Sequence, residues 1–187
     1  MPVTDGQLMR RLAAGDQQAF ALLMHQHAQR VLNVLYRIVL SQEEAEDLCQ
    51  EVFEKLWLQA PQWQDKAQVS TWLYRVAHNA ALNHRQRFQA RHLVDTDEAV
   101  RASDEQVEQS ESAGEQRDQA QRQQRIESAL AGLPEAQRAA VVFRYYQGLP
   151  VKDIAEIMET SPKAVESLLS RAKPQLKARL GGVLDAL

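Results

Sequence analysis

Residues 70–91 restrict the possible fold more than any other stretch, because they predict one helix with two incompatible faces. One face is apolar at helical spacing and must be buried against other elements; it carries Leu73, Val76, Ala77 and Ala80. The opposite face is polar and carries Arg75, Asn79, Asn83 and Gln86. Aromatic rings are expected beside that polar face, from Trp72, Tyr74 and His78.

The same stretch lacks acidic residues. Between Lys66 and Val94 there are five lysines and arginines and no aspartate or glutamate. Cations that hold phosphates, amides that read base edges and aromatic rings that stack on unpaired bases are typical of a nucleic-acid-binding surface. The alternative is a helix whose polar face is merely solvated.

The composition is that of an ordinary soluble protein. Of the 187 residues, 44% are hydrophobic and 25% are charged. No apolar run approaches the ~20 residues that span a bilayer, and the first residues contain no apolar core of a secretory signal. Cys49 is the only cysteine, which fits a reducing cytoplasm. The net charge of −3 would by itself argue against binding to nucleic acid. It is misleading here, because the charges are segregated along the chain.

Residues 41–57 predict an acidic amphipathic helix. Ser41 and Glu44 form a capping-box pattern at its start. Its apolar side is made by Ala45, Leu48, Cys49, Val52, Phe53, Leu56 and Trp57. Its acidic side carries Glu43, Glu46, Asp47, Gln50, Glu51 and Glu54. That side is either solvated or docks on a basic partner, and Cys49 is expected to be a packed thiol.

Two helices are expected before this one, over 4–14 and 17–40. Gly15 ends the first helix, and Asp16 caps the second. His27 falls on the apolar stripe of the second helix and is predicted to be a core-edge histidine. A metal site with His25 is disfavoured, because the two side chains point apart on a helix. Trp63, in the loop before residue 70, either borders a pocket for an extruded base or plugs the core.

The composition changes after Arg91. From Asp95 to Asp118 nine acids accompany only two arginines, with few large apolar residues, which predicts a disordered or loosely helical linker. Short helices follow over 125–131, from Glu135 to about Gly148, and over 151–158. The last helix begins at Ser161-Pro162, so that it forms a helix-turn-helix pattern with 151–158. Pro174 is expected to kink or end this last helix.

Four motifs, in this order, resemble those of the extracytoplasmic-function (ECF, group 4) members of the bacterial sigma-70 family. They are Gly15-Asp16-Gln17-Gln18-Ala19-Phe20, Asp47-Leu48-Cys49-Gln50-Glu51-Val52-Phe53, Ser70-Thr71-Trp72-Leu73-Tyr74-Arg75-Val76-Ala77-His78-Asn79, and a C-terminal set of Leu133-Pro134-Glu135, Gly148-Leu149 and Asp153-Ile154-Ala155-Glu156-Ile157-Met158. The resemblance implies an all-α fold of two small domains: a region 2 bundle over 1–92 and a region 4 helix-turn-helix domain over 125–187. An acidic flexible linker over 93–124 would join them.

The resemblance also gives each polar surface an expected role. The clamp helices of the largest RNA polymerase subunit would be bound by Asp47, Gln50, Glu51 and Glu54. Core RNA polymerase, with its largest and second-largest subunits, is thus the expected protein partner. The −10 element would be read and melted by Trp72, Arg75, Asn79, Asn83 and Gln86, with the loop 62–69. The −35 element would be read by Lys163, Glu166, Ser167, Ser170, Arg171 and Lys173. Promoter DNA and an anti-sigma factor are the other expected partners, and no cofactor, metal, small-molecule substrate or membrane insertion is expected.

Two departures from the family pattern affect these expectations. Leu149-Pro150 stands where many members cap the helix at Val151 with serine or threonine. Glu166 stands where many carry a cation, so it would accept a hydrogen bond from cytosine N4. The four motifs and the polar surfaces together make a cytoplasmic sigma factor without catalytic residues the main hypothesis. A stand-alone helix-turn-helix regulator, and a helical enzyme or scaffold with merely solvated polar faces, remain the alternatives.

Overall fold

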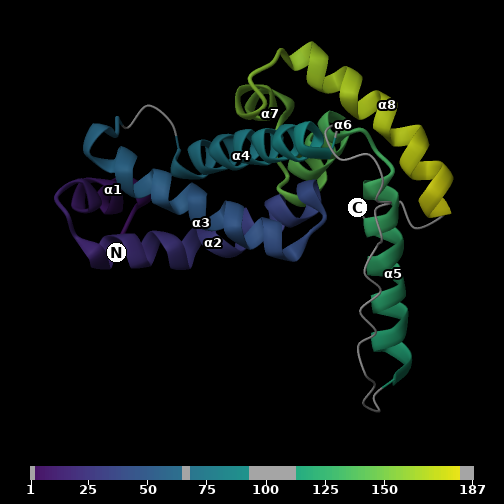
Figure 1. The fold of residues 1–187 in the computed structure, drawn as a ribbon, viewed down its shortest axis with the longest axis horizontal. Coiled ribbons are helices and arrows are strands. Elements are labelled where there is room, and N and C mark those ends of the chain that lie inside the picture. The colour runs from purple at the N-terminus through teal and green to yellow at the C-terminus, as the bar shows by residue number, and fades with distance from the viewer. Residues whose placement is uncertain (1–2, 65–67, 93–112, 182–187) are drawn as a thin grey trace.

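The computed structural model describes residues 3–64, 68–92 and 113–181 (Figure 1). Over these ranges the secondary structure is helical and contains no strand, which confirms the all-α class. Within them, no helix combines the length and hydropathy that crossing a bilayer requires.

The N-terminal half is a bundle of four helices: α1 (Asp5–Ala13), α2 (Gln17–Val39), α3 (Gln42–Gln59) and α4 (Val69–His92). Asp16 caps α2, as the sequence predicts, and Thr4, expected at the start of the first helix, is the N-cap of α1. Thr4 forms a capping box with Gln7, and Asp16 accepts bonds from the N–H groups of Gln18 and Ala19. A short 3₁₀ turn (Ala60–Gln62) follows α3.

Ser41 caps α3 as expected, but only one half of the predicted capping box is formed. The Ser41 hydroxyl accepts from the backbone N–H of Glu44. The Glu44 carboxylate lies 3.8 Å from Nδ1 of His84 on α4. The Glu44 side chain therefore links two helices.

The core of the bundle is made by the apolar stripes that the sequence predicts. Helices α2, α3 and α4 pack on one another through fully buried side chains, among them Leu23, Leu35, Leu56, Phe53 and Leu73. His27 is buried at the core edge, as predicted, with Nε2 2.9 Å from a carboxylate oxygen of Asp5. This contact ties α1 to α2.

The C-terminal half contains α5 (Ala113–Ala131), α6 (Glu135–Val141), a π-helical turn η2 (Val142–Tyr146), α7 (Val151–Ile157) and α8 (Pro162–Leu180). A second core joins α5, α6 and α8 through Ala129, Leu130, Leu133, Val141, Ala172, Leu176 and Leu180. Helix α5 begins well before the predicted start at residue 125, within the span predicted as linker. It projects away from the body of the molecule (Figure 1). Residues 93–112 of that span lie outside the described residues.

Helices α7 and α8 form the helix-turn-helix pair that the sequence predicts. Glu159 in the turn has a φ of 51°, and Ser161 caps α8 by accepting from the N–H of Ala164. The N-cap of α7 is Pro150, which makes no side-chain capping bond. Pro174 does not end α8, so this part of the prediction is wrong. Because Ala172, Leu176 and Leu180 on both sides of Pro174 are buried against the C-terminal core, their packing carries the helix through the proline.

The two halves pack closely against each other. Helix α4 contacts α7, and α2 contacts α6 and η2. One main hydrophobic cluster joins buried residues of both halves. Its members range from Leu8 in α1 to Val165 in α8 and include Phe143 and Ile154 of the C-terminal half. The sequence left the relative arrangement of the halves open, and the structure shows them in apposition.

Candidate functional site

The predicted polymerase-binding residues form an acidic surface on the outer side of α3. Asp47, Gln50, Glu51 and Glu54 are all exposed, because the opposite side of α3 is buried in the bundle. Two contacts along the helix order this surface. Nε2 of Gln50 donates to Glu54 at 3.2 Å, and Nζ of Lys55 lies 3.9 Å from Glu51. Among the described residues, no hydrogen bond or ion pair to another element holds Asp47, Glu51 or Glu54.

An apolar groove of about 560 Å³ lies between α2 and the acidic surface. Its floor includes Phe20, Leu32 and Phe53, and Gln50 and Glu54 also line it. Trp57, predicted on the buried stripe, is partly exposed and packs edge-to-face on Phe20, with 5.2 Å between ring centroids.

Cys49 also lines this groove, and it is a packed thiol, as predicted. Burial raises the pKa of the Cys49 thiol, and its Sγ lies 3.8 Å from the carbonyl oxygen of Ala28. The neutral thiol is therefore the favoured form.

The predicted −10 residues lie along one side of α4 but differ in exposure. Asn83 and Gln86 are exposed, whereas Trp72, Arg75 and Asn79 are half-buried. Trp72 packs edge-to-face against Trp63 from the preceding loop, with 6.0 Å between ring centroids. Trp63 thus lies beside the predicted DNA-binding residues while also covering part of the core. We call Trp72, Arg75, Asn79, Asn83 and Gln86 the α4 polar face.

Two aromatic residues expected beside the α4 polar face are buried instead. Tyr74 and His78 are only 6% and 4% exposed, and their rings lie 5.9 and 6.2 Å from that of Phe143. Burial lowers the pKa of His78 and raises that of Tyr74, which favours the neutral form of both. The prediction that Tyr74 and His78 flank an open face was wrong. It was based on the spacing of residues within α4, and that spacing carries no information on the C-terminal helices that cover these two side chains.

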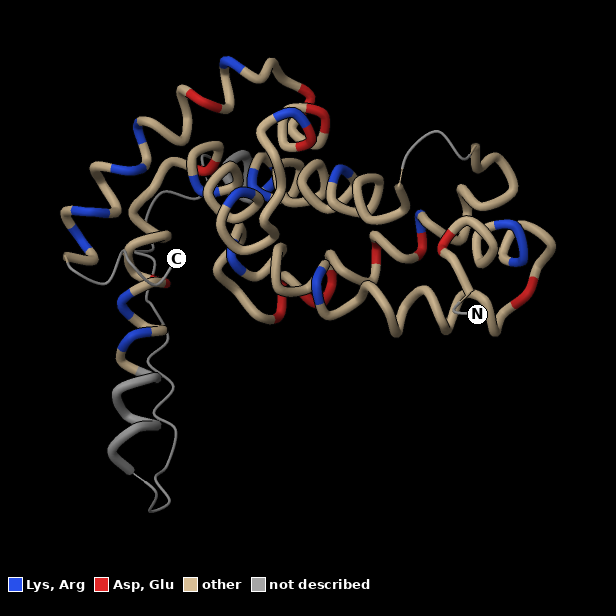
Figure 2. The backbone as a smooth tube through the Cα atoms, turned by 180° about the vertical axis from the view of Figure 1, so that it is seen from behind, with Lys and Arg blue, Asp and Glu red and all other residues tan. Residues whose placement is uncertain are grey.

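The predicted −35 residues form a polar face on α8. Lys163, Glu166, Ser170, Arg171 and Lys173 are exposed, and Ser167 is half-buried. Nη2 of Arg171 donates to Oγ of Ser167 at 2.9 Å, so these two side chains are held together. The lysines and arginines of α8 recur along the outer helix at the upper left of Figure 2. We call these six residues the α8 polar face.

Arg138 is the most important polar residue that sequence reasoning missed. It is 5% exposed and joins α6 to the end of α2. The sequence carries one signal for it: an arginine directly before the apolar run from Ala139 to Phe143. That signal indicates burial but does not identify the partner.

Comparison with known proteins identifies the family. Residues 23–92 match the model for Sigma-70 region 2, and residues 123–176 match the model for Sigma-70, region 4. The chain is 30% identical to the RNA polymerase sigma-H factor of Pseudomonas aeruginosa over 187 residues, with 96% of this chain and 95% of the relative covered. It is also 30% identical to the ECF RNA polymerase sigma-E factor of Escherichia coli K12, with 91% of each chain covered.

Solved structures share the fold. CnrH in complex with the cytosolic domain of CnrY aligns with a TM-score of 0.67 at 22% identity, covering 97% of both chains. The sigma factor RpoE of Bartonella quintana, solved with the anti-sigma factor NepR, also has a TM-score of 0.67, at 20% identity, covering 87% of this chain and 97% of the other.

Two sigma regions on one helical chain define a transcription-initiation factor. The chain belongs to the sigma-70 family, in its extracytoplasmic-function group. It is a sigma factor that directs RNA polymerase to promoters.

Proposed function

We propose that three separate surfaces divide the work of this sigma factor. The acidic surface of α3 binds core RNA polymerase, the α4 polar face reads and melts the −10 element, and the α8 polar face reads the −35 element. The observation that supports this assignment is the partition of polar groups: carboxylates on the exposed face of α3, amides with one arginine on α4, and three cations with two serines and one glutamate on α8. Opposite charges across an interface steer encounter and fix register.

The division of the chain follows the same proposal. Residues 1–92 form the polymerase-binding and −10 domain, 93–124 the acidic linker and 125–187 the −35 domain. The polymerase supplies the catalytic chemistry, so the sigma factor itself needs no cofactor or small-molecule substrate. We place its action in the cytoplasm. An anti-sigma factor is proposed as its inhibitor, in line with the NepR complex of a protein with the same fold. If that inhibitor is membrane-bound, it holds the sigma factor at the inner membrane.

Transcription with purified core polymerase on a library of genomic fragments tests the proposed function. Discrete run-off transcripts that require both core and this protein are expected. Fragment binding that is equally specific without core, and no transcripts, would instead support a stand-alone helix-turn-helix regulator. The acidic surface argues against that alternative, because a stand-alone regulator has no use for it.

The Asn79→Ala variant is expected to impair open-complex formation while leaving core binding unchanged. The amide of Asn79 is suited to hydrogen bonding with a base edge, and losing such a contact costs about 1–3 kcal/mol, or ~5–150-fold. Permanganate reactivity of unpaired thymines measures melting, and fluorescence anisotropy with core measures binding. Gln26→Ala, an exposed amide on α2, is the matched control. Equal loss of melting and core binding would contradict the assignment.

Glu166 is expected to set one base preference within the −35 element. A carboxylate accepts from cytosine N4, whereas arginine binds the O6 and N7 atoms of guanine. Glu166→Arg should therefore change the preferred base at one position by ~10–100-fold, as measured by selection from promoters randomised at −35. Glu156→Arg, at an exposed position on α7, is the control. Identical selected sequences for wild type and Glu166→Arg would remove Glu166 from the reading set.

A further inference from the structure

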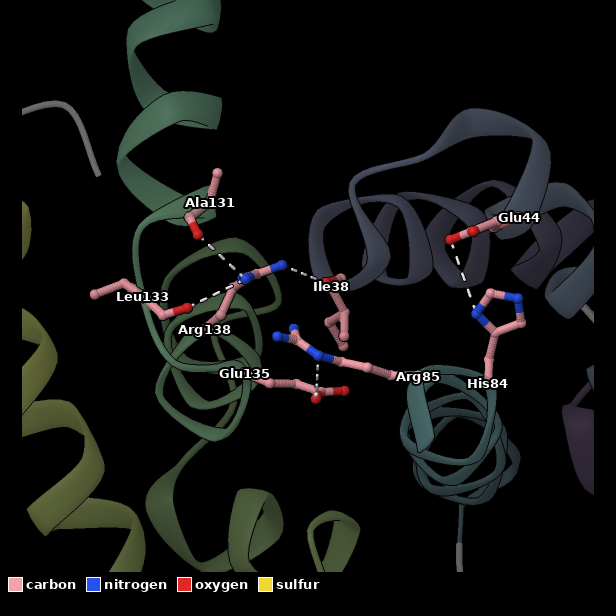
Figure 3. Close-up of polar contacts among 8 residues, drawn as sticks. All are labelled: Ile38, Glu44, His84, Arg85, Ala131, Leu133, Glu135 and Arg138. Carbon is pink, nitrogen blue, oxygen red and sulfur yellow. Dashed lines mark hydrogen bonds and ion pairs between the residues drawn. The ribbon is translucent and has the colours of Figure 1, made fainter. Parts of the chain in front are cut away.

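The contact between the two halves of the chain includes a buried arginine. Nη1 of Arg138 donates to the carbonyl oxygen of Ile38 at 2.7 Å, while Nη2 donates to the carbonyls of Ala131 and Leu133 at 3.4 and 3.1 Å (Figure 3). The Ile38 carbonyl is one of the last four of α2, which lack intrahelical partners and carry the negative end of the helix dipole. A single guanidinium thus satisfies carbonyls of both halves.

An ion pair lies beside this arginine. Nε of Arg85 on α4 is 3.4 Å from a carboxylate oxygen of Glu135 on α6 (Figure 3). Arg85 is one of the five cations in the acid-free stretch from Lys66 to Val94, so its pairing with Glu135 neutralises part of the basic surface. The guanidinium of Arg37, also on α2, lies 4.3 Å from the ring centroid of Tyr146. Arginine over an aromatic ring is an attractive arrangement.

The same apposition occupies part of the α4 polar face. Nδ2 of Asn79 lies 3.5 Å from a carboxylate oxygen of Glu159, in the turn before α8. Next to this face, on the buried side of α4, the hydroxyl of Tyr74 donates to Gln147 at 2.7 Å, and the rings of Tyr74 and His78 pack against Phe143. A carboxylate beside Asn79 competes for its amide and repels the phosphates of an approaching strand. This arrangement therefore opposes DNA binding at α4.

The contact surface is apolar enough to persist in solution. Phe143, Ile154 and Ala155 of the C-terminal half belong to the same buried cluster as Leu73 and Ala77 of α4. The two halves are also parts of one chain, so their effective concentration is on the order of millimolar, and a contact with a dissociation constant below that value stays mostly closed. The acidic surface and all of the α8 polar face except the half-buried Ser167 stay exposed in this arrangement.

We propose that this sigma factor rests in a self-closed form, in which η2 and α7 pack on the buried side of α4 and bring the turn at Glu159 against Asn79 of the α4 polar face, and that Arg138 with the Arg85–Glu135 pair forms the latch. The proposal rests on the proposed role of α4 in −10 recognition. Because the acidic surface stays exposed, core polymerase can dock on the closed form. Separation of the halves then uncovers Asn79 and releases Arg85 to bind phosphate.

Distance measurement between spin labels in the full-length chain tests the latch. Spin labels are attached through Gln18→Cys and Lys177→Cys, two exposed sites in opposite halves, after Cys49→Ala removes the native thiol. The wild-type latch is expected to give one narrow distance population. Glu135→Arg, which sets a third cation beside Arg85 and Arg138, and Arg85→Glu should each reduce that population at least twofold. The charge-swapped double variant should restore it.

The holoenzyme gives the second arm of the experiment. Adding core polymerase to the labelled wild type should remove the closed population. A broad wild-type distribution, single reversals that leave the narrow peak unchanged, or a closed peak that persists in the holoenzyme would each overturn the latch. These readouts do not depend on transcription. A chain that closes and opens in this way but yields no transcripts would contradict the proposed function and not the latch.

Discussion

Replacing Asp47, Glu51 and Glu54 together with lysine is expected to weaken holoenzyme assembly by about 100-fold or more. Each replacement exchanges attraction toward a basic partner for repulsion, and like charges brought together across an interface cost several kcal/mol. A 100-fold loss corresponds to about 2.8 kcal/mol. The affinity is measured by fluorescence anisotropy of the labelled sigma factor titrated with core polymerase at fixed salt, because surface electrostatics are screened by ions.

The structure offers a control for this triple variant. All three side chains are exposed, and their contacts are confined to α3, where a pair such as Lys55–Glu51 contributes only about 0.2–0.5 kcal/mol. The helix should therefore stay folded, as circular dichroism can verify. Glu156→Lys, which reverses an exposed charge on α7, should leave assembly unchanged. An affinity for core equal to wild type in the triple variant would remove α3 from the docking surface.

Phe53→Ala is expected to lower the free energy of unfolding by about 3–5 kcal/mol. The Phe53 side chain is 2% exposed and lies in the main cluster, so its removal sacrifices transfer free energy and leaves a cavity. Phe20 also loses an edge-to-face partner whose ring centroid lies 6.4 Å away. Urea denaturation followed by circular dichroism measures the change. The slope of the unfolding free energy against urea concentration should stay that of wild type.

The control for this variant lies on the same helix. Leu58 is 73% exposed, so Leu58→Ala should change the unfolding free energy by no more than about 0.5 kcal/mol. The contrast between the two positions separates burial from helix propensity, because both variants introduce alanine into α3. Similar losses at both positions would contradict the packing of α3 in the bundle.

Local chemistry explains why much of the fold was predictable. Thr4, Asp16, Ser41 and Ser161 cap four helices because their side-chain oxygens accept bonds from free N–H groups a few residues ahead. The apolar spacing of α3 and α4 selects the side of each helix that is buried. The exposure of the acidic surface and of most of the α8 polar face follows from the same spacing.

Contacts between distant segments were not predictable from these patterns. Arg138 meets Ile38 across 100 positions of sequence, and Tyr74 meets Gln147 across 73. Tyr74 and His78 carry polar groups at the edge of the apolar stripe of α4, so helical spacing alone leaves their burial undecided. The covering helices decide it. Likewise, α8 continues through Pro174 because buried neighbours stabilise it, which local propensity does not include.

Site-specific photocrosslinking in the promoter-bound holoenzyme tests the central claim, the division of work among three surfaces, most directly. A photoreactive amino acid is placed in turn at Gln50, Asn83 and Ser170, one exposed position on each surface. The account predicts crosslinks from Gln50 to the largest polymerase subunit, from Asn83 to the −10 strand and from Ser170 to the −35 duplex. Crosslinks from Gln50 to DNA, or from Asn83 and Ser170 to polymerase alone, would contradict it.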